Sequence, residues 1–303
     1  MTQTATSPTL GPTRVGVRAA GVALLPATEA QAVLGEIEDL GFGTFWFSEG
    51  PKSKDALTYA ALLLSWSSHL TVAAGIASIY ARDAFAMSSG AHALAEAYPG
   101  RFVLGLGVSH APLVQRRGHT YRSPLTAMRE YLDAMAEAQY AGAMPAEPLP
   151  VVLGALQPKM LSLAGERTRG AHPYFVPVAH TVDARSILGP GPLLAPDQAV
   201  VLDSDLGRAR GIANEFATVM LRFENYRRSL IRLGYDESEL TGEPSDRVVD
   251  DLVAWGDADR IAARVKAHLD AGADHVSVQV LTPGREGVPL AELRELAPAL
   301  LAL

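Results

Sequence analysis

The feature that most constrains this chain is a regular alternation of short apolar runs with longer helical patterns. Runs rich in Val, Ile, Leu and Phe predict strands, whereas apolar residues with a period near 3.6 predict amphipathic helices. The predicted strands, which alternate with helices, are Val15–Ala20, Thr44–Phe47, Leu70–Ala77, Arg101–Gly107, Val151–Ala155, Ala171–Val176, Gln198–Leu202 and His275–Leu281. They are apolar on both faces, as buried parallel strands are.

This pattern predicts an α/β protein in which a parallel sheet closes into a (β/α)8 TIM barrel. An open doubly wound sheet is the alternative, because the order of strands does not reveal closure. A continuous helix over Arg208–Leu233 is longer than one crossover needs, so we expect extra helices between strands seven and eight. We expect residues 1–303 to form one domain, with residues 1–13 flexible and without the apolar stretch of a signal peptide.

Composition excludes several classes of function. The net charge of −7 argues against a nucleic-acid-binding protein, which is usually basic. The absence of cysteine excludes disulfides and thiolate metal sites, and it fits a reducing cytoplasm. No apolar run reaches the ~20 residues of a membrane-spanning helix. We therefore expect a cytoplasmic enzyme that acts on a small molecule and contacts neither membrane nor nucleic acid.

The predicted strand ends, where TIM barrels place their active sites, carry few reactive side chains. None of the chain's lysines lies in a predicted strand, so a Schiff-base enzyme is not indicated. The histidines show no paired spacing of metal ligands, and no metal site is predicted. Glu49 follows strand two, and Asp203 and Asp205 follow strand seven, which is too thin a set for a carboxylate-bound metal. Where side chains offer little chemistry, a cofactor commonly supplies it.

Small residues are what the strand ends do offer. Glycine and alanine there allow a flat ring to approach the backbone closely. They occur after strand three (Gly75, Ile76), strand four (Gly107, Val108, Ser109, followed by His110) and strand five (Gly154, Ala155, Leu156, Gln157). Backbone N–H groups at the start of the helix after strand five could bind a phosphate. The run from Gly105 to His110 lacks the third glycine of a dinucleotide fingerprint, and Pro112 with a long loop is expected to follow it, so a Rossmann NAD site is not indicated.

Several of these segments together resemble the luciferase-like monooxygenase superfamily, and more narrowly its actinobacterial branch that uses the deazaflavin coenzyme F420. The resemblance is carried by FGTFWFSEG, LTVAAGIAS, AYPGRFVLGLGVSHAPL, LGALQPKMLSLAGERTRGAHPYFVP and AARVKAHLDAGADHVSVQVL. It implies a hydride-transferring oxidoreductase and a homodimer. Members of this family carry a non-proline cis peptide at the end of strand three, which corresponds here to Gly75-Ile76.

The resemblance also implies roles for individual residues. His110 stands where the family places a catalytic acid or a residue that grips the cofactor. Glu49 matches a carboxylate that helps to hold the coenzyme, and we consider it a second catalytic candidate. Gly154, Ala155, Leu156 and Gln157 match the phosphate loop.

Alternatives to these roles remain open at this point. His110 could be a structural turn residue, and Glu49 a solvated loop carboxylate. The cluster Arg116, Arg117, His119 and Arg122 could be a solvated face or could meet an anionic cofactor tail. Phe45, Trp46 and Phe47 are expected in the core, and His172, His180 and Thr181 could reach the site.

Differences from the family's pattern narrow the range of expected substrates. Sugar-phosphate dehydrogenases of this kind have a histidine directly after the strand-two carboxylate, where this chain has Gly50. An F420-dependent reductase or dehydrogenase of another substrate is therefore favoured. An FMN-dependent monooxygenase and a non-catalytic flavin-binding protein are the alternatives.

Overall fold

The computed structural model describes residues 10–50, 52–285 and 287–303. Within these ranges the strands are β1 (Val15–Arg18), β2 (Thr44–Phe47), β3 (Thr71–Ala74), β4 (Ala77–Ser78), β5 (Phe102–Gly107), β6 (Val151–Leu153), β7 (Gly170–Ala171), β8 (Leu193–Leu194), β9 (Asp197–Leu202), β10 (Val253–Gly256) and β11 (Val276–Val280). The helices are α1 (Ala27–Asp39), α2 (Ala56–Trp66), α3 (Ala84–Ala97), α4 (Ala111–Arg116), α5 (Pro124–Glu137), α6 (Pro158–Arg167), α7 (Val178–Leu188), α8 (Leu206–Met220), α9 (Glu224–Arg232), α10 (Asp246–Leu252), α11 (Ala258–Asp270) and α12 (Leu290–Leu301). Short 3-10 turns cover Ala20–Leu24, Glu237–Glu239 and Pro283–Arg285.

All strand pairs are parallel, and the main path runs β10-β9-β11-β1-β2-β3-β5-β6-β7-β8. The two ends of this path meet because β8 leads directly into β9. The N–H of Ala195 donates to the carbonyl of Ala171 in β7 (2.9 Å), and the N–H of Ser277 in β11 donates to the carbonyl of Pro196 (2.9 Å). One segment thus joins β7 to β11 and closes the ring. The predicted TIM barrel is confirmed, and the open sheet is excluded.

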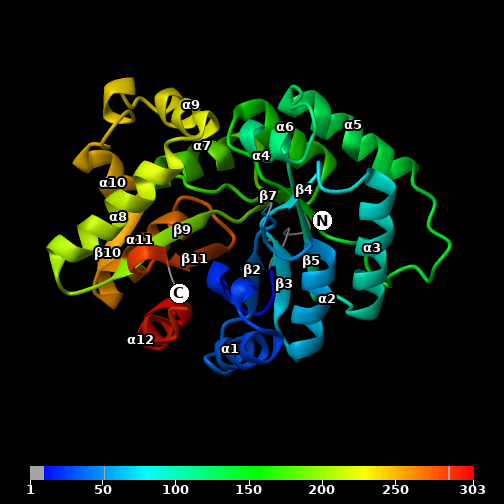
Figure 1. Ribbon diagram of the computed structural model, residues 1–303, viewed down its shortest axis with the longest axis horizontal. Coiled ribbons are helices and arrows are strands. Elements are labelled where there is room, and N and C mark those ends of the chain that lie inside the picture. Colours follow the sequence, from blue (N-terminus) through cyan, green and yellow to red (C-terminus); the bar gives the residue numbers. More distant parts are fainter. Residues whose placement is uncertain (1–9, 51, 286) are drawn as a thin grey trace, which may run out of the picture.

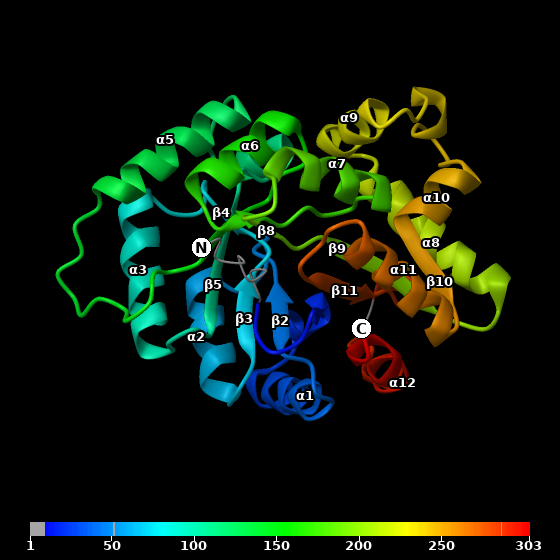
Figure 2. The ribbon, with the colours of Figure 1, turned by 180° about the vertical axis from the view of Figure 1, so that it is seen from behind.

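Helices surround this ring on the outside (Figures 1 and 2). Helix α1 lies near α12, and an Arg294–Glu36 ion pair links the two helices (Figures 1 and 2). The predicted extra helices between the seventh and eighth barrel strands are confirmed as α8, α9 and α10, which form a group at one side of the molecule (Figure 1). None of the helices in the described ranges is both long and apolar enough to span a bilayer.

Several element boundaries differ from the predictions. Of the sixth predicted strand, Ala171–Val176, only Ala171 lies in a strand, β7 (Gly170–Ala171), and Pro173 further along has no N–H to donate to a ladder. Helix α4 replaces the loop predicted after the fourth barrel strand, with Pro112 in its first turn. The side chain of Asp83 caps α3 by accepting from the N–H of Ala86, whereas α1 starts at Ala27 after Pro26 without a side-chain cap. Strand β10 was not predicted.

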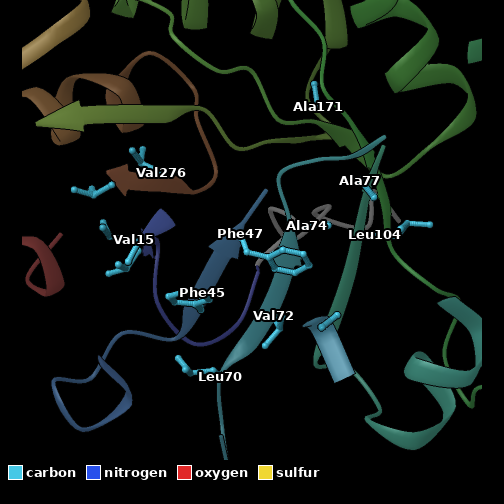
Figure 3. Close-up of a cluster of buried hydrophobic side chains, with 14 of the residues drawn as sticks. Val15, Phe45, Phe47, Leu70, Val72, Ala74, Ala77, Leu104, Ala171 and Val276 are labelled. Carbon is cyan, nitrogen blue, oxygen red and sulfur yellow. The ribbon is translucent and has the colours of Figure 1, made fainter. Parts of the chain in front are cut away.

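The barrel core is built from the aliphatic and aromatic side chains that point from the strands toward the helices and toward one another. Figure 3 shows part of this cluster, with Phe45 and Phe47 of β2 beside Val72 and Ala74 of β3. A second apolar cluster holds the extra helices against β9 and β10, and it includes Phe216, Tyr226, Leu230 and Val249. Of the first thirteen residues, 1–9 lie outside the described ranges. Leu10 is buried, and its carbonyl accepts a hydrogen bond from Thr44 (3.0 Å).

Candidate active site

A cavity of about 320 Å³ opens at the carboxyl ends of the barrel strands. Its lining includes most of the residues that the sequence singles out, namely Glu49, Gly75, Ile76, Gly107, Val108, Ser109, His110, Gly154, Ala155 and Leu156. Gln157 lines an adjoining cavity of about 780 Å³, which shares Val108, Ser109, His110, Gly154 and Leu156 with the first. The fold therefore brings segments from strands three, four and five together at one mouth.

The Gly75–Ile76 peptide bond is cis, at the position where the resemblance places such a bond. The predicted strand Leu70–Ala77 is interrupted there and continues as β4. Two hydrogen bonds hold this break against β2: the N–H of Gly75 donates to the carbonyl of Phe47 (2.6 Å), and the N–H of Glu49 donates to the carbonyl of Ile76 (3.1 Å). The Gly75–Ile76 segment thus forms part of the cavity wall.

The two glycines of β5 leave room for this break in the third barrel strand. A Cβ atom at Gly105 would lie 1.8 Å from the carbonyl oxygen of Ala74, and one at Gly107 would lie 2.5 Å from the side chain of Ile76. From the sequence we expected these glycines to admit a flat ring. The structure shows that they first admit the neighbouring strand.

We expect Gly105→Ala to destabilise the fold by about 1–3 kcal/mol or more, because the obstructing atom is backbone and cannot rotate away. Gly35→Ala is the matched control. Gly35 lies inside α1 with nothing within 4 Å of its added Cβ, so that substitution should stabilise the helix by roughly 0.5–1 kcal/mol. Urea denaturation of both variants measures the difference. Equal stabilities would contradict the role of Gly105.

A buried polar network forms the floor of the cavity, and sequence reasoning missed its centre, Arg18. The guanidinium donates to Asp197 (2.6 Å) and to the carbonyl of Gly75 (2.9 Å), and it lies 2.7 Å from Nε2 of His172. Ser277 also donates to Asp197 (2.9 Å). An arginine in the first predicted strand was the available signal, because buried charges in proteins are normally paired.

The tautomer of His172 follows from its neighbours. Its Nδ1 lies 2.6 Å from the carbonyl oxygen of Ala195, which can only accept, so Nδ1 carries the proton and Nε2 accepts from Arg18. Burial, and then the charge of Arg18, hold the pKa of His172 well below its ordinary value. The indole of Trp46 stacks on this imidazole at 4.0 Å. His172 is therefore a neutral part of the floor.

His110 lines the cavity and is half-buried. It precedes α4, and its ring stacks on Phe223 with the centroids 4.1 Å apart. Burial lowers the pKa of His110, and a side-chain hydrogen bond with Asn225 opposes that shift. At neutral pH the imidazole is therefore largely uncharged, with one ring nitrogen engaged by Asn225.

Glu49 has a different environment from His110. Its carboxylate pairs with Arg82 (2.5 Å) and accepts hydrogen bonds from the backbone N–H of Ser78 (2.9 Å) and of Ala56 (3.3 Å). The side chain is 3% exposed. These contacts tie the segment after β2 to β4 and α2, and they suit an anchoring group better than a proton carrier. The catalytic role assigned to Glu49 stays a prediction.

The helix predicted over Arg208–Leu233 is broken in the structure, and the break supplies residues that sequence reasoning missed. Helix α8 ends at Met220 and α9 begins at Glu224, after Phe223. Phe223, Asn225 and Tyr226 consequently line the cavity across from the barrel strands. Neither glycine nor proline marks this break in the sequence.

The adjoining cavity combines the start of α6 with cationic side chains. It is lined by Gln157, Lys159, Arg222 and Arg228. Arg228 pairs with Glu224 (2.6 Å), whereas Lys159 and Arg222 are exposed and form no ion pair with any residue of the described ranges. This cavity can therefore accept a negatively charged group.

Other candidates lie elsewhere. His180 is buried in α7 and bonds the carbonyl of Leu156 (2.9 Å), and Thr181 bonds His268 (2.7 Å). Arg116, Arg117, His119 and Arg122 are all exposed and line neither cavity, and Arg122 pairs with Glu130 (2.6 Å). Phe45, Trp46 and Phe47 are buried as predicted.

The combination of a barrel, a cis Gly75–Ile76 bond and small residues at the cavity wall agrees with a family model described as luciferase-like monooxygenase, which matches residues 9–188. The chain belongs to this family. A 5,10-methylenetetrahydromethanopterin reductase of Methanolobus tindarius is 27% identical to this chain over 149 residues. That match covers 44% of this chain and 46% of the relative, so the chain matches less than half of the relative's length.

Solved structures of this fold include proteins with two different cofactors. An F420-dependent secondary alcohol dehydrogenase in complex with an F420-acetone adduct superposes with a TM-score of 0.74 at 13% identity, covering 95% of this chain and 99% of that one. The oxygenating constituent of 3,6-diketocamphane monooxygenase from Pseudomonas putida, in complex with FMN, gives a TM-score of 0.66 at 14% identity, covering 96% and 98%. These likenesses establish the shared fold.

Proposed function

We propose that the protein is an F420-dependent oxidoreductase that transfers a hydride between C5 of the deazaflavin and a small organic substrate. The observation that carries the proposal is the pair of connected cavities: one has a wall of small residues, and the other presents cationic groups that no carboxylate neutralises. Both F420 and FMN have a flat ring and a phosphate, but F420 also carries a glutamyl tail with further carboxylates. Lys159 and Arg222 suit that longer anionic tail.

The residues present fit the coenzyme. Gly75, Gly107 and Gly154 line the first cavity together with Ile76, which fills the space beside Gly107 and Gly154, and this small-residue wall would lie against the ring. The N–H groups at the start of α6, after Gln157, would bind the phosphate. Ion pairing with Asp197 compensates the charge of Arg18 in the cavity that would hold the ring.

The chemistry divides between coenzyme and protein. When bound, the deazaflavin would supply or take up the hydride at C5. His110 would hold or move the accompanying proton at the substrate oxygen, so that hydride and proton together convert a carbonyl to an alcohol or the reverse. Phe223 and Tyr226 would exclude water from this space.

Titration of the purified protein with F420 and with FMN, followed by tryptophan fluorescence, tests the choice of cofactor. We expect F420 to bind at least about tenfold more tightly, which corresponds to ~1.4 kcal/mol. Tight binding of FMN without binding of F420 would reject the proposal and favour a flavin monooxygenase. Binding of F420 with no turnover over a broad panel of alcohols, ketones and enones would favour a non-catalytic binding protein.

Lys159→Gln and Arg222→Gln are each expected to weaken F420 binding by about three- to tenfold, the effect of one partly exposed charge contact. The deazaflavin ring with its ribityl chain alone, which has neither phosphate nor glutamates, should bind both variants as it binds the unsubstituted protein. Lys266→Gln is the matched control, because Lys266 lies on α11 and pairs with Asp270 outside both cavities. If the variants bound F420 and the ring with its ribityl chain equally weakly, the substitutions would instead have perturbed the pocket for the ring.

A further inference from the structure

The charges around the first cavity are all compensated. Among its lining residues in the described ranges, Arg18 pairs with Asp197 and Glu49 pairs with Arg82, and the contacts of His172 require its neutral form. The free cations, Lys159 and Arg222, line the adjoining cavity instead. A charged substrate would therefore lose its hydration in the first cavity without gaining an opposite charge, which is strongly unfavourable.

The cavity wall at the break between α8 and α9 is aromatic. Phe223 stacks on His110 at an interplanar angle of 26°, Tyr226 is tilted against the same imidazole with the centroids 5.5 Å apart, and Met220 and Leu113 complete the apolar surface. The ring of Phe175 packs edge-on against that of Tyr226, with the centroids 5.2 Å apart, and stabilises its position. Flat apolar molecules match such a surface.

His110 lies beside this wall and offers a polar group to the cavity. Of the residues in the described ranges, only Asn225 forms a hydrogen bond with the His110 ring, which leaves one ring nitrogen for a ligand. A single oxygen atom placed there would lie at the edge of the aromatic surface. The lining thus offers the His110 ring and neutral polar side chains such as Ser48, Ser109 and Gln279 for hydrogen bonds, but no charge without a partner.

We propose that the substrate is an uncharged ketone or alcohol with a flat, apolar body, and that Phe223 determines this preference by stacking beside His110. The proposal deepens the proposed function and rests on it for the reaction. It excludes phosphorylated and carboxylated substrates from the first cavity. Binding itself can be tested without turnover.

The test compares 1-indanone with its 5-carboxylate, two flat ketones of the same shape that differ by one charge. Calorimetric titrations use the protein alone and the protein saturated with F420. We expect the neutral ketone to bind at least tenfold more tightly in both. Equal or tighter binding of the carboxylate, or no binding of either ketone, would overturn the inference. If F420 fails to bind, the proposed function is rejected. The affinities of the two ketones for the protein without coenzyme can still be compared, so the inference about the substrate is tested separately.

Phe223→Ala should lower the affinity for 1-indanone by about five- to twentyfold, and Phe223→Leu, which keeps an apolar side chain, by less. The control is Phe85→Ala, because Phe85 is a 53% exposed phenylalanine of α3 that lines neither cavity. An unchanged indanone affinity in Phe223→Ala, with the circular dichroism spectrum preserved, would show that this ring does not select the substrate.

Discussion

His110→Ala is expected to slow turnover by ~10²–10⁴-fold, the usual contribution of a general acid or base. The affinity for the coenzyme should change far less, because the ring wall is formed by backbone of β3 to β6 rather than by His110. Steady-state kinetics at saturating coenzyme, with fluorescence titration of binding, separate the two effects. Unchanged kcat with weakened coenzyme binding would show that His110 only seats the coenzyme. His119→Ala is the control, because His119 is exposed and lines neither cavity.

The pH dependence should identify the direction in which His110 works. Because burial lowers its pKa below the ordinary 6.5, the imidazole is neutral above that pKa and becomes protonated only as the pH falls through it. As a base in alcohol oxidation, His110 would lose activity as the pH falls through this range. As an acid in ketone reduction, it would gain activity over the same interval. His110→Ala should abolish this limb of the pH–rate profile, whereas an unaltered limb in the variant would assign it to another group.

Arg18→Met is expected to destabilise the protein by about 3–5 kcal/mol, because it leaves the carboxylate of Asp197 buried without its partner. The two side chains of this pair are only 4% and 1% exposed. Urea denaturation at neutral pH measures the loss. Replacing both partners, as Arg18→Met with Asp197→Leu, should recover part of it, since no uncompensated charge then remains in the floor.

Lys266→Met provides the comparison for Arg18→Met. Its pair with Asp270 is exposed on both sides and spans four residues of α11, so its loss should cost no more than about 0.5 kcal/mol. If Arg18→Met cost as little as Lys266→Met, the Arg18–Asp197 pair would not be a structural support of the cavity floor.

Much of the architecture followed from local patterns. Apolar runs such as Phe102–Leu104 are short, bounded and flanked by helical periodicity, so they predict strand and connection in order. The small residues at Gly75, Gly107 and Gly154 marked the strand ends that line the cavity, because glycine at the end of a buried strand signals close approach. The sequence therefore pointed to residues that line the cavity. The reason for glycine at position 107 differs from the expected one, because its missing side chain makes room for Ile76 rather than for a coenzyme.

Local patterns failed where distant contacts decide the structure. Closure of the ring depends on hydrogen bonds from Ala195 toward β7 and from β11 toward Pro196, which no single segment encodes. The break between α8 and α9 has no glycine or proline, and the second apolar cluster holds Tyr226 in place from several elements.

By itself, the sequence determined the alternation of elements, the α/β class and the small residues of the cavity wall, because these depend on residue type and short-range spacing. The candidacy of His110 came from the resemblance to the family. Only the tertiary structure decided that Arg18 is neutralised by Asp197, residues far apart in the chain, and that Phe223 and Asn225 meet His110. Charge compensation and ring stacking act over a few ångströms in space. Residues that are distant in sequence come within that range only after the barrel has closed.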